Sequence, residues 1–133
     1  MNKNQIAAAL QEGGYLDHNN AFLEGYLGAK PKSFFGMFKD VGYSISRQIV
    51  LSYADGALCI VKFKKKQIVS VARFKLEDVI AYSTQEDGPS KIMNIYASVE
   101  GKKNDYYFKT MQDIGAMDRL IVAERKYTMV KSL

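Results

Sequence analysis

The sequence contains no tryptophan, one cysteine (Cys59), one histidine (His18) and two prolines among its 133 residues. A single cysteine cannot form an internal disulfide, and one cysteine with one histidine cannot supply the four ligands of a structural zinc site. The apolar run near the amino terminus, Ile6 to Leu10, is too short for a signal-peptide core or a membrane span. These shortages predict a cytoplasmic, soluble protein with no metal and no cofactor, which does not insert into a membrane.

The residue patterns of a catalytic site are also missing. Asp17 and His18 are adjacent in sequence, but a catalytic base must be oriented by a further group in space. The carboxylate pairs Glu77-Asp78 and Glu86-Asp87 have no partner acid at a spacing that supports general acid–base catalysis. We therefore predict no catalytic residues and a protein that is not an enzyme.

Length and composition describe one globular domain. Apolar residues make up 47% of the chain and charged residues 25%, which is the ordinary globular mix. A chain of this length can bury about two thirds of its unfolded surface without a metal or disulfide. Without repeats or linkers, the sequence predicts a single domain over residues 1–133. It divides into an N-terminal helical extension with the first strand (1–41), antiparallel strands (42–111) and a C-terminal helix (112–127).

The first forty residues predict two short helices around one extended piece. Apolar residues at helical spacing and the following Gly13-Gly14 predict a helix over residues 3–11. Residues 20–28 read as a first strand. Pro31 suits the first turn of a helix, and the phenylalanines after it predict a short helix or turn from Pro31 to Lys39.

From residue 42 the pattern becomes that of strands. Residues 43–53 are rich in β-branched and aromatic residues, and Asp55-Gly56 suits a two-residue hairpin turn. Further strands are predicted at 57–64, 67–75, 79–84, 91–99 and 105–111, with a loop at 85–90 and a polar turn at 100–104. A last amphipathic helix follows, with Asp113 near its start and four apolar residues on one face: Ile114, Met117, Leu120 and Ile121.

This order of elements resembles that of bacterial pleckstrin-homology-like (PH-like) domains. The likeness lies in "SISRQIVLSYADGALCIVKFKKKQIVSVARFKLEDVIAYS" and in "YYFKTMQDIGAMDRLI", which looks like a last strand running into a capping helix. The resemblance implies an α+β, mainly β fold. We expect a bent antiparallel sheet or small barrel of about seven strands, capped by the C-terminal helix. PH-like folds host lipid binding, peptide binding and scaffolding, so the fold does not choose among them.

Positive charge is concentrated in one stretch of the chain. The net charge is +5, and the segment from Gly56 to Lys75 holds no acidic residue. With Lys65-Lys66 as a two-residue turn, Lys64 would pair with Gln67, Lys62 with Val69 and Leu58 with Arg73. Alternation would then send Cys59 and Phe63 into the core and gather cations on the other face. The predicted basic residues are Lys62, Lys64, Lys65, Lys66, Arg73 and Lys75.

Three roles are open for this lysine hairpin. It can be a solvated hairpin whose charges guard a sheet edge against aggregation. It can bind an acidic lipid or a phosphate, since Lys64 and Arg73-Phe74-Lys75 resemble the basic residues with which some PH domains grip phosphoinositides. It can also bind nucleic acid weakly, because so small a face neutralises only a few phosphates.

A second candidate surface is aromatic. Tyr106, Tyr107 and Phe108 are consecutive, so at least one ring of a strand here must face outward. We predict a partner surface made by Tyr106 and Tyr107 together with Phe34, Phe35, Met37 and Phe38. The sequence thus predicts an interaction module that binds a protein partner or assembles with itself; the alternative is a module for anionic ligands.

Overall fold

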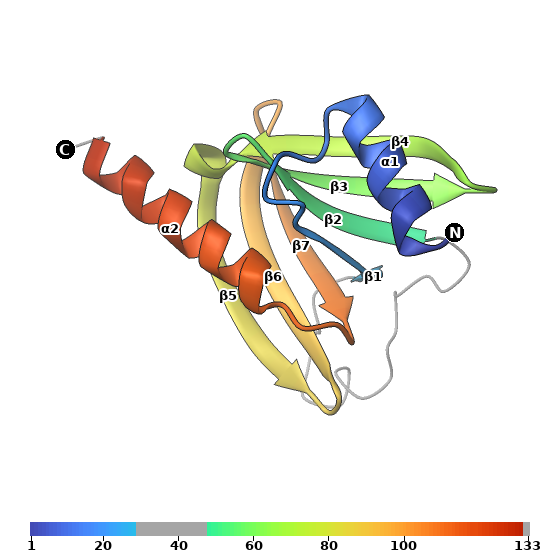
Figure 1. Ribbon diagram of the computed structural model, residues 1–133. Coiled ribbons are helices and arrows are strands. Elements are labelled where there is room, and N and C mark those ends of the chain that lie inside the picture. Colours follow the sequence, from blue (N-terminus) through green and yellow to red (C-terminus); the bar gives the residue numbers. More distant parts are fainter. Residues whose placement is uncertain (29–47, 132–133) are drawn as a thin grey trace.

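Seven antiparallel strands form one bent sheet, with a helix before the first strand and another after the last (Figure 1). The structure is a computed structural model that describes residues 1–28 and 48–131. The strand order across the sheet is β4-β3-β2-β1-β7-β6-β5. The predicted fold class, mainly β with a bent sheet of about seven strands and a C-terminal helix, is confirmed. The elements are α1 (Lys3–Gly13), β1 (Phe22–Gly28), β2 (Gln48–Ala54), β3 (Ala57–Lys64), β4 (Gln67–Lys75), η2 (Leu76–Asp78), β5 (Val79–Asp87), β6 (Ser90–Val99), β7 (Lys102–Thr110) and α2 (Gly115–Lys131).

Helix α1 begins at a capping box and ends at a glycine. The backbone N–H of Gln5 donates to Asn2 Oδ1 at 2.9 Å, and the backbone N–H of Asn2 donates to Gln5 Oε1 at 3.0 Å. Gly14 ends the helix in the left-handed conformation with φ of 79°. Ile6 and Leu10 are buried, so the predicted helix and its apolar face are confirmed.

Within the described ranges, three hairpin turns have two consecutive residues at positive φ, as type I′ turns require. They are Asp55-Gly56 (φ 51° and 79°), Lys65-Lys66 (52° and 65°) and Glu100-Gly101 (52° and 78°). The predicted turns at Asp55-Gly56 and Lys65-Lys66 are confirmed. The lysine turn differs from the other two because it has no glycine at its second position.

Two strands are longer than the sequence predicts. β5 continues to Asp87, which pairs with Ser90, so the loop predicted at 85–90 shrinks to the turn at Gly88-Pro89. β7 begins at Lys102, which pairs with Val99, so the polar turn shrinks to Glu100-Gly101. Gln85, Glu86, Lys102 and Lys103 are exposed along these strands, whereas Asp87 is half-buried and Ser90 is buried.

Both faces of the sheet carry a buried apolar cluster. The larger cluster lies between one face and α2 and includes Leu58, Ile60, Phe74, Met93, Phe108, Met117 and Ile121. The smaller cluster lies between the other face and α1 and comprises Ile6, Leu10, Leu16, Val50, Cys59, Val61 and Phe63. The inward positions predicted for Cys59 and Phe63 are confirmed. Alternation places Leu58 and Ile60 on the opposite face, which the sequence predicts to be the exposed basic face. Both are buried, because α2 closes a second core over that face.

Strand β1 changes its neighbour partway along its length. Residues Phe22 to Gly25 pair with β2, and residues Tyr26 to Gly28 pair with β7. A Cβ on Gly25 would lie only 2.2 Å from the carbonyl oxygen of Lys109. Glycine is therefore required at this crossing, because no side chain fits between the two backbones.

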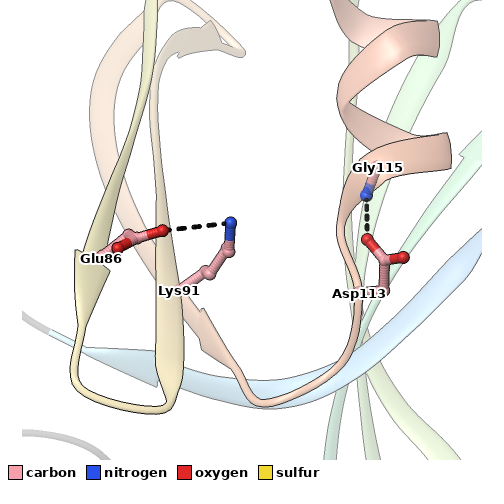
Figure 2. Close-up of polar contacts among 4 residues, drawn as sticks. All are labelled: Glu86, Lys91, Asp113 and Gly115. Atoms are coloured by element: carbon pink, nitrogen blue, oxygen red, sulfur yellow. Dashed lines mark hydrogen bonds and ion pairs between the residues drawn. The ribbon is translucent and has the colours of Figure 1, made fainter.

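Helix α2 is fastened to the sheet at its first turns. The hydroxyl of Tyr82 on β5 donates to Asp118 Oδ1 at 2.5 Å. Burial, together with this carboxylate, raises the pKa of Tyr82 far above its ordinary value. The backbone N–H of Gly115 donates to Asp113 Oδ1 at 2.8 Å, just where the helix begins (Figure 2). Ile114, Met117 and Ile121 are buried, which confirms the predicted apolar face.

Candidate functional site: the β3–β4 hairpin and the edge of β4

The β3–β4 hairpin contains a register shift that the sequence does not reveal. Lys64 lies opposite Gln67, as predicted. Between Phe63 and Lys62 the register shifts, so that Lys62 lies opposite Ser70 rather than Val69. From there to the end of β4 every partner differs by one position, and Arg73 lies opposite Cys59 rather than Leu58. A β-bulge inserts one extra residue in this way.

The bulge divides the basic residues between the two faces of the sheet. Lys62 and Lys64 alternate with Phe63 and share the face of Leu58 and Ile60. Arg73 lies opposite Cys59 and Lys75 opposite Ala57, so both belong to the face that α1 covers. The single basic face predicted from the sequence is therefore wrong.

The basic residues are also separated along the hairpin. Gln67 and Arg73 are six residues apart on one strand, a span of about 20 Å. Arg73 donates from Nη1 to the carbonyl oxygen of Gly14 at 3.3 Å, and Lys75 Nζ lies 3.7 Å from Glu77 Oε1. The structure does not bring Lys64 together with Arg73 and Lys75 as the phosphoinositide-binding pattern would require.

The tip of the hairpin is a compact group of lysines. Lys64, Lys65 and Lys66 are exposed and Lys62 is half-buried. Among the described residues none of the four has a carboxylate within ion-pair distance. A left-handed backbone conformation costs an ordinary residue roughly 1–2 kcal/mol. The tip therefore carries positive charge that no described residue neutralises, and a turn whose backbone strain glycine would relieve.

Strand β4 is one edge of the sheet, and one side of its backbone pairs with no strand that the structure describes. Residues that flank a two-residue turn exchange both backbone hydrogen bonds, so Gln67 points its N–H and C=O toward β3. At the other end of β4, beyond the bulge, the N–H of Leu76 donates to the carbonyl of Gly56 at 2.9 Å. Leu76 therefore points its backbone groups toward the side of β3, and alternate residues before it point theirs the opposite way. The backbone groups of Val71, Arg73 and Lys75 therefore face away from β3. At the Arg73–Lys75 end the strand lies close to the end of β6, where Ser98 and Val99 line the same cleft. Val69, on the other side of Val71 along the strand, is 54% exposed.

The far end of β4 carries an acidic corner. A cleft of about 360 Å³ lies where β4 passes into η2, beside the turn between β6 and β7. Its lining includes three carboxylates, Glu77, Asp78 and Glu100, beside the cations Arg73 and Lys75. We call these three carboxylates the acidic corner. Glu77 and Asp78 directly follow the strand in sequence, but only the fold shows that Glu100 joins them.

The predicted aromatic surface is not an exposed patch in the described residues. Tyr106 is half-buried and its ring stacks on that of Phe74, with centroids 5.5 Å apart and an interplanar angle of 2°. Tyr107 is 8% exposed, and Phe108 is fully buried. Burial raises the pKa of Tyr106 and of Tyr107. The other members of the predicted surface, Phe34, Phe35, Met37 and Phe38, lie outside the described residues, as does the predicted helix from Pro31 to Lys39.

The opposite edge, β5, carries acidic residues that already have partners. Glu86 Oε1 lies 3.5 Å from Lys91 Nζ on β6 (Figure 2). Asp87 Oδ2 lies 3.0 Å from Lys109 Nζ on β7, and both of these side chains are largely buried. The register between β5 and β6 also shifts near Val79, at the beginning of the strand. The charges at this edge are thus neutralised within the molecule, unlike the lysines of the hairpin tip.

Groups that could carry catalysis or hold a metal are not assembled in the described part of the chain. No group of three or more metal-ligating side chains is found within residues 1–28 and 48–131. Cys59 is fully buried and burial raises the pKa of its thiol, whereas His18 is exposed in a turn. In the same ranges, no helix is long and apolar enough to cross a membrane.

Comparison with known proteins identifies no family for this chain. No protein-family model matches the chain, and no curated protein matches it.

Proposed function

We propose that the protein is a non-enzymatic, cytoplasmic interaction module of the PH-like kind, which binds a protein partner through the open edge of β4. The observation that carries this proposal is the side of the β4 backbone that pairs with no strand in residues 1–28 or 48–131; the charged side chains of β4 are all cationic. Support for the PH-like kind comes from the seven consecutive antiparallel strands followed by α2, the order on which the sequence resemblance depends.

A free sheet edge binds an extended segment by adding it as a further strand. Backbone hydrogen bonds supply affinity, and the side chains along the edge select the partner. β4 has nine residues and no proline, and Arg73 and Lys75 accompany its open backbone groups. The preferred partner is therefore an extended segment with carboxylates at alternate positions, which would lie beside these cations.

The test is titration with a peptide of alternating valine and glutamate, monitored by the backbone amide signals of the protein. We expect the signals of Val71 and Arg73 to shift and those of β5 to stay. Val71→Pro removes an outward N–H and should abolish the shifts, since proline is tolerated where an edge N–H faces solvent. Val71→Thr keeps the N–H and is the matched control. Absence of any response on β4 would refute the proposal.

A second function has a specific observation in its favour. The unneutralised lysines of the hairpin tip suit an acidic lipid or a phosphate, and lysine binds such groups as a point charge. Binding of this kind predicts co-sedimentation with vesicles containing an anionic lipid, weakening as salt rises. Lys65→Gln/Lys66→Gln should reduce the bound fraction. No co-sedimentation at low salt would remove this function.

A further inference from the structure

We infer that the partner strand at the β4 edge is β4 of a second copy of this chain, paired antiparallel about a two-fold axis at Val71. The inference rests on the proposed use of this edge and names the partner. Pairing two β4 edges would join the two sheets into one continuous sheet, and a two-fold axis closes the assembly at a dimer.

The strand is suited to such pairing in its length and its hydrogen bonding. Val71 is the middle residue of Gln67–Lys75. Its N–H and C=O face the free edge, so the two Val71 residues can exchange both hydrogen bonds across the axis. Arg73 of each copy then lies opposite Val69 of the other, and its aliphatic stem can cover that exposed side chain.

The two ends of β4 carry opposite charge. The hairpin tip holds Lys65 and Lys66, and the other end leads into Glu77 and Asp78 of the acidic corner. Antiparallel pairing centred on Val71 brings the tip of each copy beside the acidic corner of the other. The lysines of the tip and the carboxylates that follow β4 attract each other in this arrangement, and the attraction occurs twice in each dimer.

The neighbouring register with its axis at Ser70 loses this complementarity, because it would place Lys75 directly opposite Lys65 of the other copy. Like charges directly opposite each other on paired strands are destabilising. An axis at Val71 places no like charges directly opposite each other, and Val71 is the middle residue of the strand.

The sheet's other edge is a poorer match for β4. Pairing β4 with β5 of another copy would be a heterologous contact, which produces rings or open filaments instead of two-fold dimers. Glu86 of β5 is paired with Lys91 within the same molecule (Figure 2). Asp87 is paired with Lys109 in the same way. In the acidic corner, Glu77 is paired with Lys75, whereas Asp78 and Glu100 have no ion pair with any described residue and remain available to the lysines of the tip.

A charge-swap experiment tests the inference by sedimentation velocity over a wide range of protein concentration. The wild-type chain should change from monomer to dimer as its concentration rises. Lys65→Glu/Lys66→Glu and Glu77→Lys/Asp78→Lys should each remain monomeric, because each places like charges at both contacts. An equimolar mixture of the two variants should dimerise again, because both contacts are then attractive. All four positions are exposed, so the variants should keep the fold, which circular dichroism checks.

Several results would overturn the inference. These are a wild-type chain that stays monomeric up to millimolar concentration, a mixture of the charge variants that stays monomeric, a dimer that persists in Val71→Pro, and assemblies larger than a dimer. The peptide titration separates this failure from that of the proposed function. If the chain is monomeric but Val71 responds to the acidic peptide, the edge binds another protein and self-pairing alone is refuted.

Discussion

Replacing the lysine turn by a sequence that suits its backbone should stabilise the monomer. The variant is Lys65→Asn/Lys66→Gly. Lys65 and Lys66 have φ of 52° and 65°, while the other two type I′ turns have glycine at the second position. A left-handed conformation costs a residue with a side chain roughly 1 kcal/mol or more, and asparagine and glycine pay less of that cost.

The expected gain in the free energy of unfolding is about 1–2 kcal/mol, most of it from the glycine. For a domain of this length, that corresponds to a rise in Tm of about 3–7 °C. Thermal and urea unfolding followed by circular dichroism would measure it. The protein concentration should be low enough that association does not contribute to the apparent stability.

The variant also removes two positive charges beside Lys62 and Lys64, and relief of repulsion would stabilise the fold as well. Lys65→Gln/Lys66→Gln is the matched control, because it removes the same charges and leaves the backbone strain. If the asparagine–glycine variant is no more stable than this control, the turn is not strained and the reasoning is wrong. If it is more stable, the lysines reduce stability, which supports a role for them in binding.

Two further predictions concern the buried polar groups. Tyr82→Phe removes the hydrogen bond to Asp118 and should lower the free energy of unfolding by about 1–2 kcal/mol at neutral pH, measured by urea denaturation. Folding raises the pKa of Tyr82, so the wild-type chain should lose stability as the pH rises above about 10, the ordinary tyrosine pKa. The variant should lose less stability over the same pH range. Equal losses would contradict this role of Tyr82. In the native chain, the thiol of Cys59 should react with a thiol reagent only as fast as the fold opens, because the side chain is fully buried beneath α1. In urea it should react completely. Rapid labelling of the native chain would show that α1 does not cover the thiol.

The sequence predicts the succession of elements well, because each has a strong local signal. Helix α1 has a capping residue and a glycine stop, and Asp55-Gly56 has the composition that its turn requires. The C-terminal helix shows an apolar face at the spacing of a helix. The ends of β5 and β7 were predicted less well, since polar residues on an exposed strand look the same as residues of a loop.

The candidate site could be predicted only in part. The lysines of the tip stand out in the sequence, and the prediction that Lys64 pairs with Gln67 is confirmed. The bulge beside Phe63 has no signal in a run of alternating apolar residues, so the assignment of Arg73 to the face of Lys62 was wrong. The burial of Leu58 and Ile60 depends on α2, which is distant in sequence. The acidic corner forms only because the β6–β7 turn, which carries Glu100, lies beside η2 in the fold.

The change of neighbour along β1 affects the order in which the chain can fold. The half of β1 beside β2 has its partner close by in the sequence, so β1 to β4 can form as a meander of local hairpins. The half beside β7 pairs Tyr26 with Lys109 and must wait until nearly the whole chain has been synthesised. Gly25 is the joint between these early and late pairings. A residue with a side chain there would leave β1 and β2 able to meet but would hinder the step that unites the two halves of the protein.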